Sequence, residues 1–309
     1  MVKMIYRAKV IHYNSLLKIV SFLSLLTAQA VLAAPEIAKP FITKPLIITT
    51  IKPLAIIAQS AVGDQARVEY LQSAVQSAHE VSLPVSALKK IDQADLIIRI
   101  GEMFESRVAK PMTLLPESKR ITVMQLPLLP PTDADAEGEA GHSHSHEHSS
   151  LSADPHVWLN PENANRIAAE IQQRLELPIK AIISPEQVAG LAKSLSLFRD
   201  KQFLIHHDAL DHFTSHFKLQ SGLSIRDASG ASQGVRSQYR LRQDAIASAA
   251  SCIFIEPQYA DRDAQVIAEE LSLPVAVIDL QGLDQALVGD AYASFMQTLA
   301  MQFKSCFSD

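Results

Sequence analysis

The segment Leu46-Ile47-Ile48-Thr49-Thr50-Ile51 decides the fold class of this chain of 309 residues. Its apolar character is nearly continuous, which is typical of a strand buried on both faces of a parallel sheet. Lys52-Pro53 and an apolar helical run over residues 54–62 follow it directly. A buried strand followed at once by a helix favours an α/β fold with parallel sheets.

The same alternation continues along the rest of the chain. Strands are predicted at residues 96–100, 121–126, 203–206, 252–255 and 275–278, and helices at residues 161–175, 185–199 and 263–271. Ligands of open α/β sheets bind beyond the carboxyl ends of the strands. His207 and Asp279 occupy such positions, and they are therefore candidate ligand-binding residues.

The amino-terminal residues have the layout of a cleavable secretory signal peptide, predicted at 1–33. Lys3, Arg7, Lys9 and Lys18 precede an apolar run over residues 19–33 that ends in small residues. The run is short for a bilayer span, which needs about 20 residues. An uncleaved membrane anchor is the alternative, and export is the prediction.

Charge and cysteine usage narrow the functional classes. The net charge of −5 comes without a basic stripe, so a nucleic-acid partner is not indicated. Cys252 and Cys306 are the two cysteines, and in an exported chain a disulfide is the simplest interpretation. Closing a loop of roughly 55 residues would stabilise the fold by about 4 kcal/mol. Two free thiols, or two soft metal ligands, are the alternatives.

A histidine-rich, acidic tract indicates metal handling. His142, His144, His146 and His148 alternate with other residues inside a polar stretch, residues 133–152, which we expect to be a loop. Ordering such a segment costs about 1–2 kcal/mol per residue in backbone entropy, so its metal affinity should be low. A low-affinity zinc collector, a sensor of metal excess and a dispensable linker are the three interpretations.

His156 lies just beyond the tract in the ordered string Asp154-Pro155-His156-Val157-Trp158-Leu159-Asn160-Pro161-Glu162. Asn160, Pro161 and Glu162 form a helix start with a cap, a proline and an acidic first turn. Asp154 is expected either to orient the imidazole of His156 or to begin a turn. Asp208, His212 and His216 are spaced four apart, and a solvated helix face is favoured over an exposed metal pair.

Several motifs, in this order, resemble the periplasmic zinc-binding proteins of bacterial ABC uptake systems, the ZnuA-type metal receptors. The most specific is the D-P-H-x-W-L-x-P-E string around His156. The others are Thr49 to Pro53, Ser77-Ala78-His79-Glu80, the histidine tract, His207-Asp208-Ala209, Glu256-Pro257-Gln258 and Ile278-Asp279. The resemblance covers nearly all of the mature chain.

The resemblance implies two similar α/β lobes with parallel sheets, joined by a long rigid helix, with a metal cleft between them. It implies domains at residues 34–180, 181–200 for the inter-lobe helix, and 201–309. It also implies Zn²⁺ ligands His79 and His156 from the first lobe and His207 from the second, with Asp279 either as a fourth ligand or beside a water molecule. Three nitrogens and one oxygen suit four-coordinate Zn²⁺.

The resemblance further implies a monomeric receptor that passes Zn²⁺ to a membrane permease driven by a cytoplasmic ATPase, with no catalysis. A manganese or iron receptor of the same superfamily is the first alternative, although a carboxylate in place of His207 would be expected there. A secreted zinc hydrolase is the second alternative. No H-E-x-x-H cluster supports it, and only Glu256 and Glu80 could be nominated as its base.

Overall fold

The computed structural model describes residues 44–79, 85–105, 112, 115–131, 154–259 and 262–307. The chain divides into two units, Met1–Thr43 and Lys44–Asp309, and all described residues belong to the second. The predicted signal peptide at 1–33 and the histidine tract with His142, His144, His146 and His148 lie outside the described residues.

The first lobe contains a parallel four-stranded sheet in the order β2-β1-β3-β4. Its strands are β1 (Leu46–Thr49), β2 (Arg67–Tyr70), β3 (Leu96–Arg99) and β4 (Arg120–Thr122), and its helices are α2 (Lys52–Val62), α3 (Val85–Gln93) and α5 (Pro161–Arg174). Every residue of the two central strands β1 and β3 is buried, as their apolar sequences predict.

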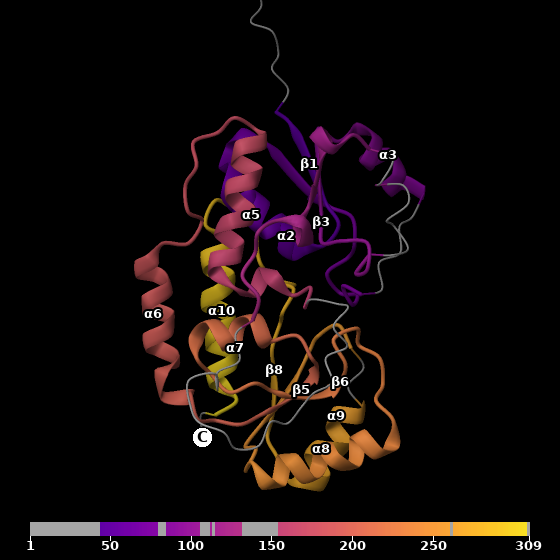
Figure 1. Ribbon diagram of the computed structural model, residues 1–309, viewed down its shortest axis with the longest axis vertical. Coiled ribbons are helices and arrows are strands. Elements are labelled where there is room, and N and C mark those ends of the chain that lie inside the picture. Colours follow the sequence, from indigo (N-terminus) through magenta and orange to yellow (C-terminus); the bar gives the residue numbers. More distant parts are fainter. Residues whose placement is uncertain are drawn as a thin grey trace, which may run out of the picture. The chain divides into compact units, whose positions relative to one another are not determined.

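The second lobe repeats this topology with the order β6-β5-β7-β8, again all parallel. Its strands are β5 (Leu204–His207), β6 (Leu223–Arg226), β7 (Ile253–Ile255) and β8 (Val275–Val277), and its helices are α7 (Asp211–Phe217), α8 (Val235–Ala247) and α9 (Arg262–Leu271). The expectation of two α/β lobes with parallel sheets is therefore confirmed, and Figure 1 shows both sheets with their helices.

Two helices connect the lobes. α6 (Pro185–Leu195) lies within the segment predicted as the inter-lobe helix, and it is 11 residues long. Ser184 and Gln187 cap its first turn reciprocally in a capping box. α10 (Ala291–Ser305), the last helix, packs against α2 and α6 as well as β8.

Five short 3-10 helices complete the described structure: η1 (Gly63–Gln65), η2 (Glu117–Lys119), η3 (Val123–Gln125), η4 (Val157–Leu159) and η5 (Ser196–Phe198). The strand predicted over residues 121–126 is wrong beyond Thr122, because the chain turns there into η3. None of the helices in the described part of the chain has the length and apolar character needed to cross a bilayer.

One hydrophobic core extends through both lobes. It includes Ile48 in β1, Trp158 in η4, and Phe254 and Phe303 of the second lobe, all fully or almost fully buried. A smaller cluster under α8 and α9 is separate from it. Cys252 and Cys306 form a disulfide with 5.8 Å between their Cα atoms, which confirms the predicted pairing and ties the start of β7 to the end of α10.

Candidate metal centre

His207 and Glu256 lie together at the carboxyl edge of the second sheet. His207 is the last residue of β5, and Glu256 directly follows β7, the strand paired with it. The chain leaves β5 for β6 on one side and returns to β7 on the other, so this edge is the switch point of the sheet, where α/β folds bind ligands. Nδ1 of His207 lies 2.5 Å from Oε1 of Glu256, and both side chains are buried.

His156 occupies the turn that precedes η4. Asp154 accepts a hydrogen bond from the backbone N–H of His156 at 3.0 Å, and its Oδ1 lies 2.7 Å from Nδ1 of the imidazole. Asp154 therefore orients the ring, as one of the two expectations for it proposed. Trp158 holds the turn against the second lobe, because its indole N–H donates to the carbonyl of Leu280 at 2.9 Å.

His79 lies in an irregular stretch after β2. Its ring packs against Phe104, with 4.6 Å between the centroids. Burial, reinforced by repulsion from His156 and His207, lowers the pKa of His79 to about 3. The imidazole is therefore neutral near pH 7, which is the form that binds a metal ion.

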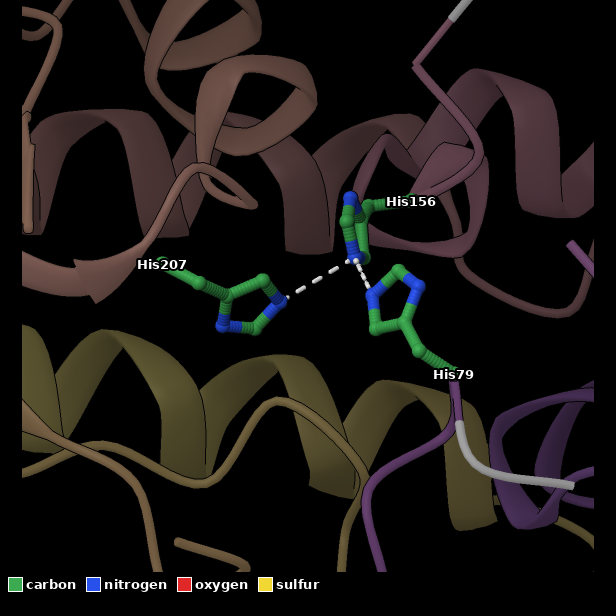
Figure 2. Close-up of side chains that lie close together, drawn as sticks. All are labelled: His79, His156 and His207. Atoms are coloured by element: carbon green, nitrogen blue, oxygen red, sulfur yellow. Dashed lines mark hydrogen bonds between the residues drawn. The ribbon is translucent and has the colours of Figure 1, made fainter. Parts of the chain in front are cut away.

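The three imidazoles converge on one point, as Figure 2 shows. Nε2 of His156 lies 3.2 Å from Nε2 of His79 and 3.3 Å from Nε2 of His207. Within the described residues, these three histidines form the one group of three or more potential metal ligands. Zn–N bonds of about 2.0–2.1 Å in a tetrahedron place neighbouring nitrogens roughly 3.3–3.4 Å apart, which matches both distances.

The carboxylates assign the tautomers of two of these rings. Because ionised Asp154 and Glu256 only accept hydrogen bonds, His156 and His207 must carry their ring protons on Nδ1 when neutral. Each Nε2 then presents a lone pair to the centre. Facing lone pairs repel each other, and a cation or a proton between them removes the repulsion. Histidines that bind metals commonly do so in this arrangement, in which one ring nitrogen binds the metal and the other donates a hydrogen bond to a carboxylate.

The same carboxylates set the charge of the site. Burial lowers the pKa of His207, but the charge and hydrogen bond of Glu256 outweigh burial, so the net pKa is raised above 6.5. Burial raises the pKa of Asp154, but His156 outweighs burial and the net pKa is lowered. Both carboxylates thus favour positive charge at the centre, from a proton or from a metal ion.

The cavity at this point has a volume of about 10 Å³. Besides the three histidines, it is lined by Ala78, Trp158, Glu256, Tyr259, Leu280 and Gln281. A space of this size admits a single ion or one water, so an organic substrate is excluded from it.

Asp279, predicted as a fourth ligand, does not belong to the group of converging ligands. Its Oδ1 accepts hydrogen bonds from the side chain of Gln258 at 3.2 Å and from the backbone of Gln281 at 3.0 Å, and its Oδ2 accepts one from the backbone of Leu283. The prediction placed Asp279 correctly at a strand end. The carboxylate is instead engaged by the loop that follows the strand.

Other histidines have structural surroundings. His206 stacks on Tyr259 with 4.2 Å between centroids, whereas the adjacent His207 reaches the centre, as the alternation of a strand requires. His212 is buried, and its Nε2 lies 3.2 Å from the carbonyl of Asp154. The expectation of a solvated face is therefore wrong at His212.

The sequence interpretation missed the roles of Glu256 and Phe104 at the site. Glu256 could have been found, because it follows a predicted strand as directly as His207 does, and adjacent parallel strands end at the same edge. Phe104 carries no comparable signal, because it lies in a turn after β3.

Comparisons with known proteins agree with this description. The family described as zinc-uptake complex component A, periplasmic (ZnuA) matches residues 47–178 and 186–306. The high-affinity zinc uptake system protein ZnuA of Haemophilus ducreyi is 26% identical over 288 residues, covering 85% of this chain and 93% of that protein. The protein of the same name from Yersinia pestis is 27% identical over 312 residues, covering 90% and 96%.

Solved structures show the same fold. A crystal structure of ZnuA aligns with a TM-score of 0.62 and 18% identity, covering 85% of this chain and 99% of that one. A manganese-bound periplasmic metal-binding protein from Candidatus Liberibacter asiaticus aligns with a TM-score of 0.64 and 18% identity, covering 85% and 99%. With the family match extending over both lobes, the chain belongs to the periplasmic zinc-uptake complex component A family.

Proposed function

We propose that this chain is a periplasmic receptor that captures one Zn²⁺ with His79, His156 and His207 and delivers it to an ABC-type permease. The observation that carries the proposal is the convergence of three Nε2 atoms at 3.2 and 3.3 Å, the spacing of ligands on four-coordinate zinc. No bond chemistry is required of the protein. Because Asp279 accepts hydrogen bonds from Gln258, Gln281 and Leu283, a water molecule would take the fourth coordination position of the zinc ion.

The donor set favours zinc over manganese or iron. Three imidazoles with no carboxylate in the group suit borderline metals such as zinc, whereas manganese prefers carboxylate and water oxygen. The names of the curated relatives also support zinc. The manganese-bound structure of the same fold keeps a manganese receptor as the alternative. Competition binding, in which Mn²⁺ readily displaces Zn²⁺, would favour that alternative.

A zinc hydrolase is disfavoured by the position of Glu256. A hydrolase needs a general base within reach of a metal-bound water. The carboxylate of Glu256 is paired with Nδ1 of His207 on the far side of the ring from the convergence point, so it supports a ligand. Membership of a solute-binding family supports the same conclusion.

The remaining parts of the proposal rest on the sequence and on the family. A signal peptide at 1–33 would export a monomeric chain to the periplasm, and a membrane permease with its ATPase would be the partner. Residues 34–180 and 201–309 would form the lobes, with 181–200 between them. His142, His144, His146 and His148 would collect zinc at low affinity and raise its local concentration for the main site.

Native mass spectrometry that counts bound zinc tests the proposal. Wild type, a deletion of residues 133–152, and the control His216→Ala, which changes a histidine outside the converging group, should each keep one tightly bound zinc. His156→Ala should lose it, because the central ligand of the group is removed. A tight zinc that is lost in the deletion but kept in His156→Ala would reverse the roles of the two histidine groups.

A further inference from the structure

His79 is the one histidine of the three that lies in a longer irregular stretch of backbone. His207 ends a strand, and His156 is fixed by Asp154 and by η4. Residues 72–79, the His79 loop, instead have no regular secondary structure. The position of the His79 imidazole must therefore depend on what holds this loop.

Side chains of the second lobe hold the His79 loop at alternate positions. The amide of Gln258 donates to the carbonyl of Ala74 at 3.1 Å, and the amide of Gln281 donates to the carbonyl of Gln76 at 3.1 Å. Each bond joins residues more than 180 positions apart in the sequence. The loop that carries a first-lobe ligand is thus fastened to the second lobe.

A third contact brings this fastening up to His79 itself. The hydroxyl of Tyr259 lies 2.8 Å from Oγ of Ser77. The same Oγ accepts a hydrogen bond from the backbone N–H of His79 at 3.3 Å. Fixing Ser77 therefore fixes the backbone of the ligand two residues later.

Asp279 organises the donors of this arrangement. Its Oδ1 accepts one hydrogen of the Gln258 amide, so the other hydrogen points to Ala74. The same oxygen accepts the backbone N–H of Gln281, which positions that residue with its side chain toward Gln76. Gln281 is 5% exposed, so its amide is held in a protein environment in which a hydrogen bond is not readily replaced by water.

We propose that Gln258, Asp279 and Gln281 form a clasp that positions His79 on the metal and thereby sets the rate of zinc release. The inference rests on the proposed function. None of the three clasp residues belongs to the group of converging ligands, although Gln281 lines the cavity, and the hydrogen bonds of Gln258 and Gln281 reach the His79 loop. With the clasp opened, the Tyr259–Ser77 contact remains as the described link from the second lobe to the loop, so His79 withdraws more readily and leaves the ion on two imidazoles. Release then accelerates while capture by His156 and His207 is little changed.

The test compares Gln258→Met, Gln281→Met and the double variant with wild type, in the full mature chain. Methionine keeps the length of the side chain and removes the donor. Gln285→Met is the matched control, because the amide of Gln285 only makes an exposed hydrogen bond to the carbonyl of its neighbour Ala286. Zinc release is followed by stopped flow into excess chelator, and capture is followed by the association rate.

Each lost amide hydrogen bond should speed release by about three- to tenfold, and the double variant by roughly 10- to 100-fold. The association rate, the melting temperature of the metal-free protein and the Co²⁺ absorption spectrum measured at saturating Co²⁺ should stay close to wild type. In a His79→Ala background, the Gln281→Met change should have no further effect on release, because the ligand that the clasp positions is gone.

The outcomes separate the inference from the function on which it rests. If wild type holds no tight zinc, the proposed function fails. If wild type holds zinc and the double variant releases it at the wild-type rate, the clasp is refuted. Equal acceleration by Gln281→Met in the presence and in the absence of His79 also refutes it, since the effect would not pass through His79.

Discussion

Replacing Glu256 with glutamine tests how much the metal centre depends on the charge behind His207. In wild type, Nδ1 of His207 lies 2.5 Å from Oε1 of Glu256. Glutamine has nearly the same shape and can still accept this hydrogen bond. The change therefore removes a buried negative charge and leaves the geometry of the ring in place. Outer ligand partners of this kind contribute about 10- to 100-fold to metal affinity, which is about 1.4–2.7 kcal/mol.

The pH dependence gives this prediction its sign. In wild type, Glu256 holds the pKa of His207 above 6.5. As the pH falls, protons therefore begin to compete with zinc for His207 at a pH above 6.5. Without the charge, only the weaker effects of Asp208 and Asp154 oppose burial, so the pKa of His207 falls and proton competition begins at a lower pH. Glu256→Gln should therefore bind zinc more weakly than wild type at pH 8, and the difference should shrink as the pH falls toward 6.

Zinc affinity measured by chelator competition at pH 8, 7 and 6 checks both parts. Glu269→Gln, a change at an exposed position of α9, is the control and should match wild type at every pH. Equal affinity of Glu256→Gln and wild type at pH 8, or a difference that grows toward acid pH, would refute the reasoning. Either result would mean that the carboxylate does not support His207 as a ligand.

Two further predictions concern stability. Burial raises the pKa of Glu105 to about 7, although the hydrogen bond from Thr50 opposes this shift. The stability linked to this group is therefore fully present below its unfolded pKa near 4.5, and it is lost as the pH rises through about 7. In urea unfolding of the metal-free protein, the unfolding free energy of Glu105→Gln should rise relative to that of wild type by up to about 3 kcal/mol between pH 5 and 8. A constant difference between the two unfolding free energies over this pH range would contradict the prediction. Reducing the Cys252–Cys306 disulfide, whose cysteines are 54 positions apart, should lower the unfolding free energy by about 4 kcal/mol. The Cys252→Ser/Cys306→Ser variant is the control, and its stability should not change with reductant. An unchanged urea midpoint of reduced wild type would exclude this contribution.

The central strands and their ligands could be predicted from sequence because their signals are local. β1, β3, β5 and β7 each contain a short apolar run and are mostly buried, and such runs identify a strand without reference to the rest of the chain. His207 then follows from its position at a strand end. The helix start at Asn160 was equally local, and the structure shows Asn160 accepting from Glu162 and Asn163 as a cap.

The edge strands could not be predicted in the same way. β2 has the sequence Arg67-Val68-Glu69-Tyr70 and is exposed or half-buried throughout, and β6 has one fully buried residue. An edge strand packs on fewer neighbours, so its sequence carries a weaker apolar pattern. What makes these segments strands is the pairing with β1 and β5, which depends on the whole sheet.

Asp279 shows where inference from position alone stops. Asp279 and Glu256 both lie beyond the carboxyl ends of strands, where ligands are expected. The partners that each carboxylate contacts depend on loops that the strand pattern does not describe. Asp279 meets backbone and amide donors of the loop after β8, whereas Glu256 meets a histidine from the next strand. Three donors occupy lone pairs of the Asp279 carboxylate, and two of the residues that supply them, Gln258 and Gln281, also bind the loop of His79. A residue that is absent from the group of ligands can therefore still control the ligand that the sequence identified least directly.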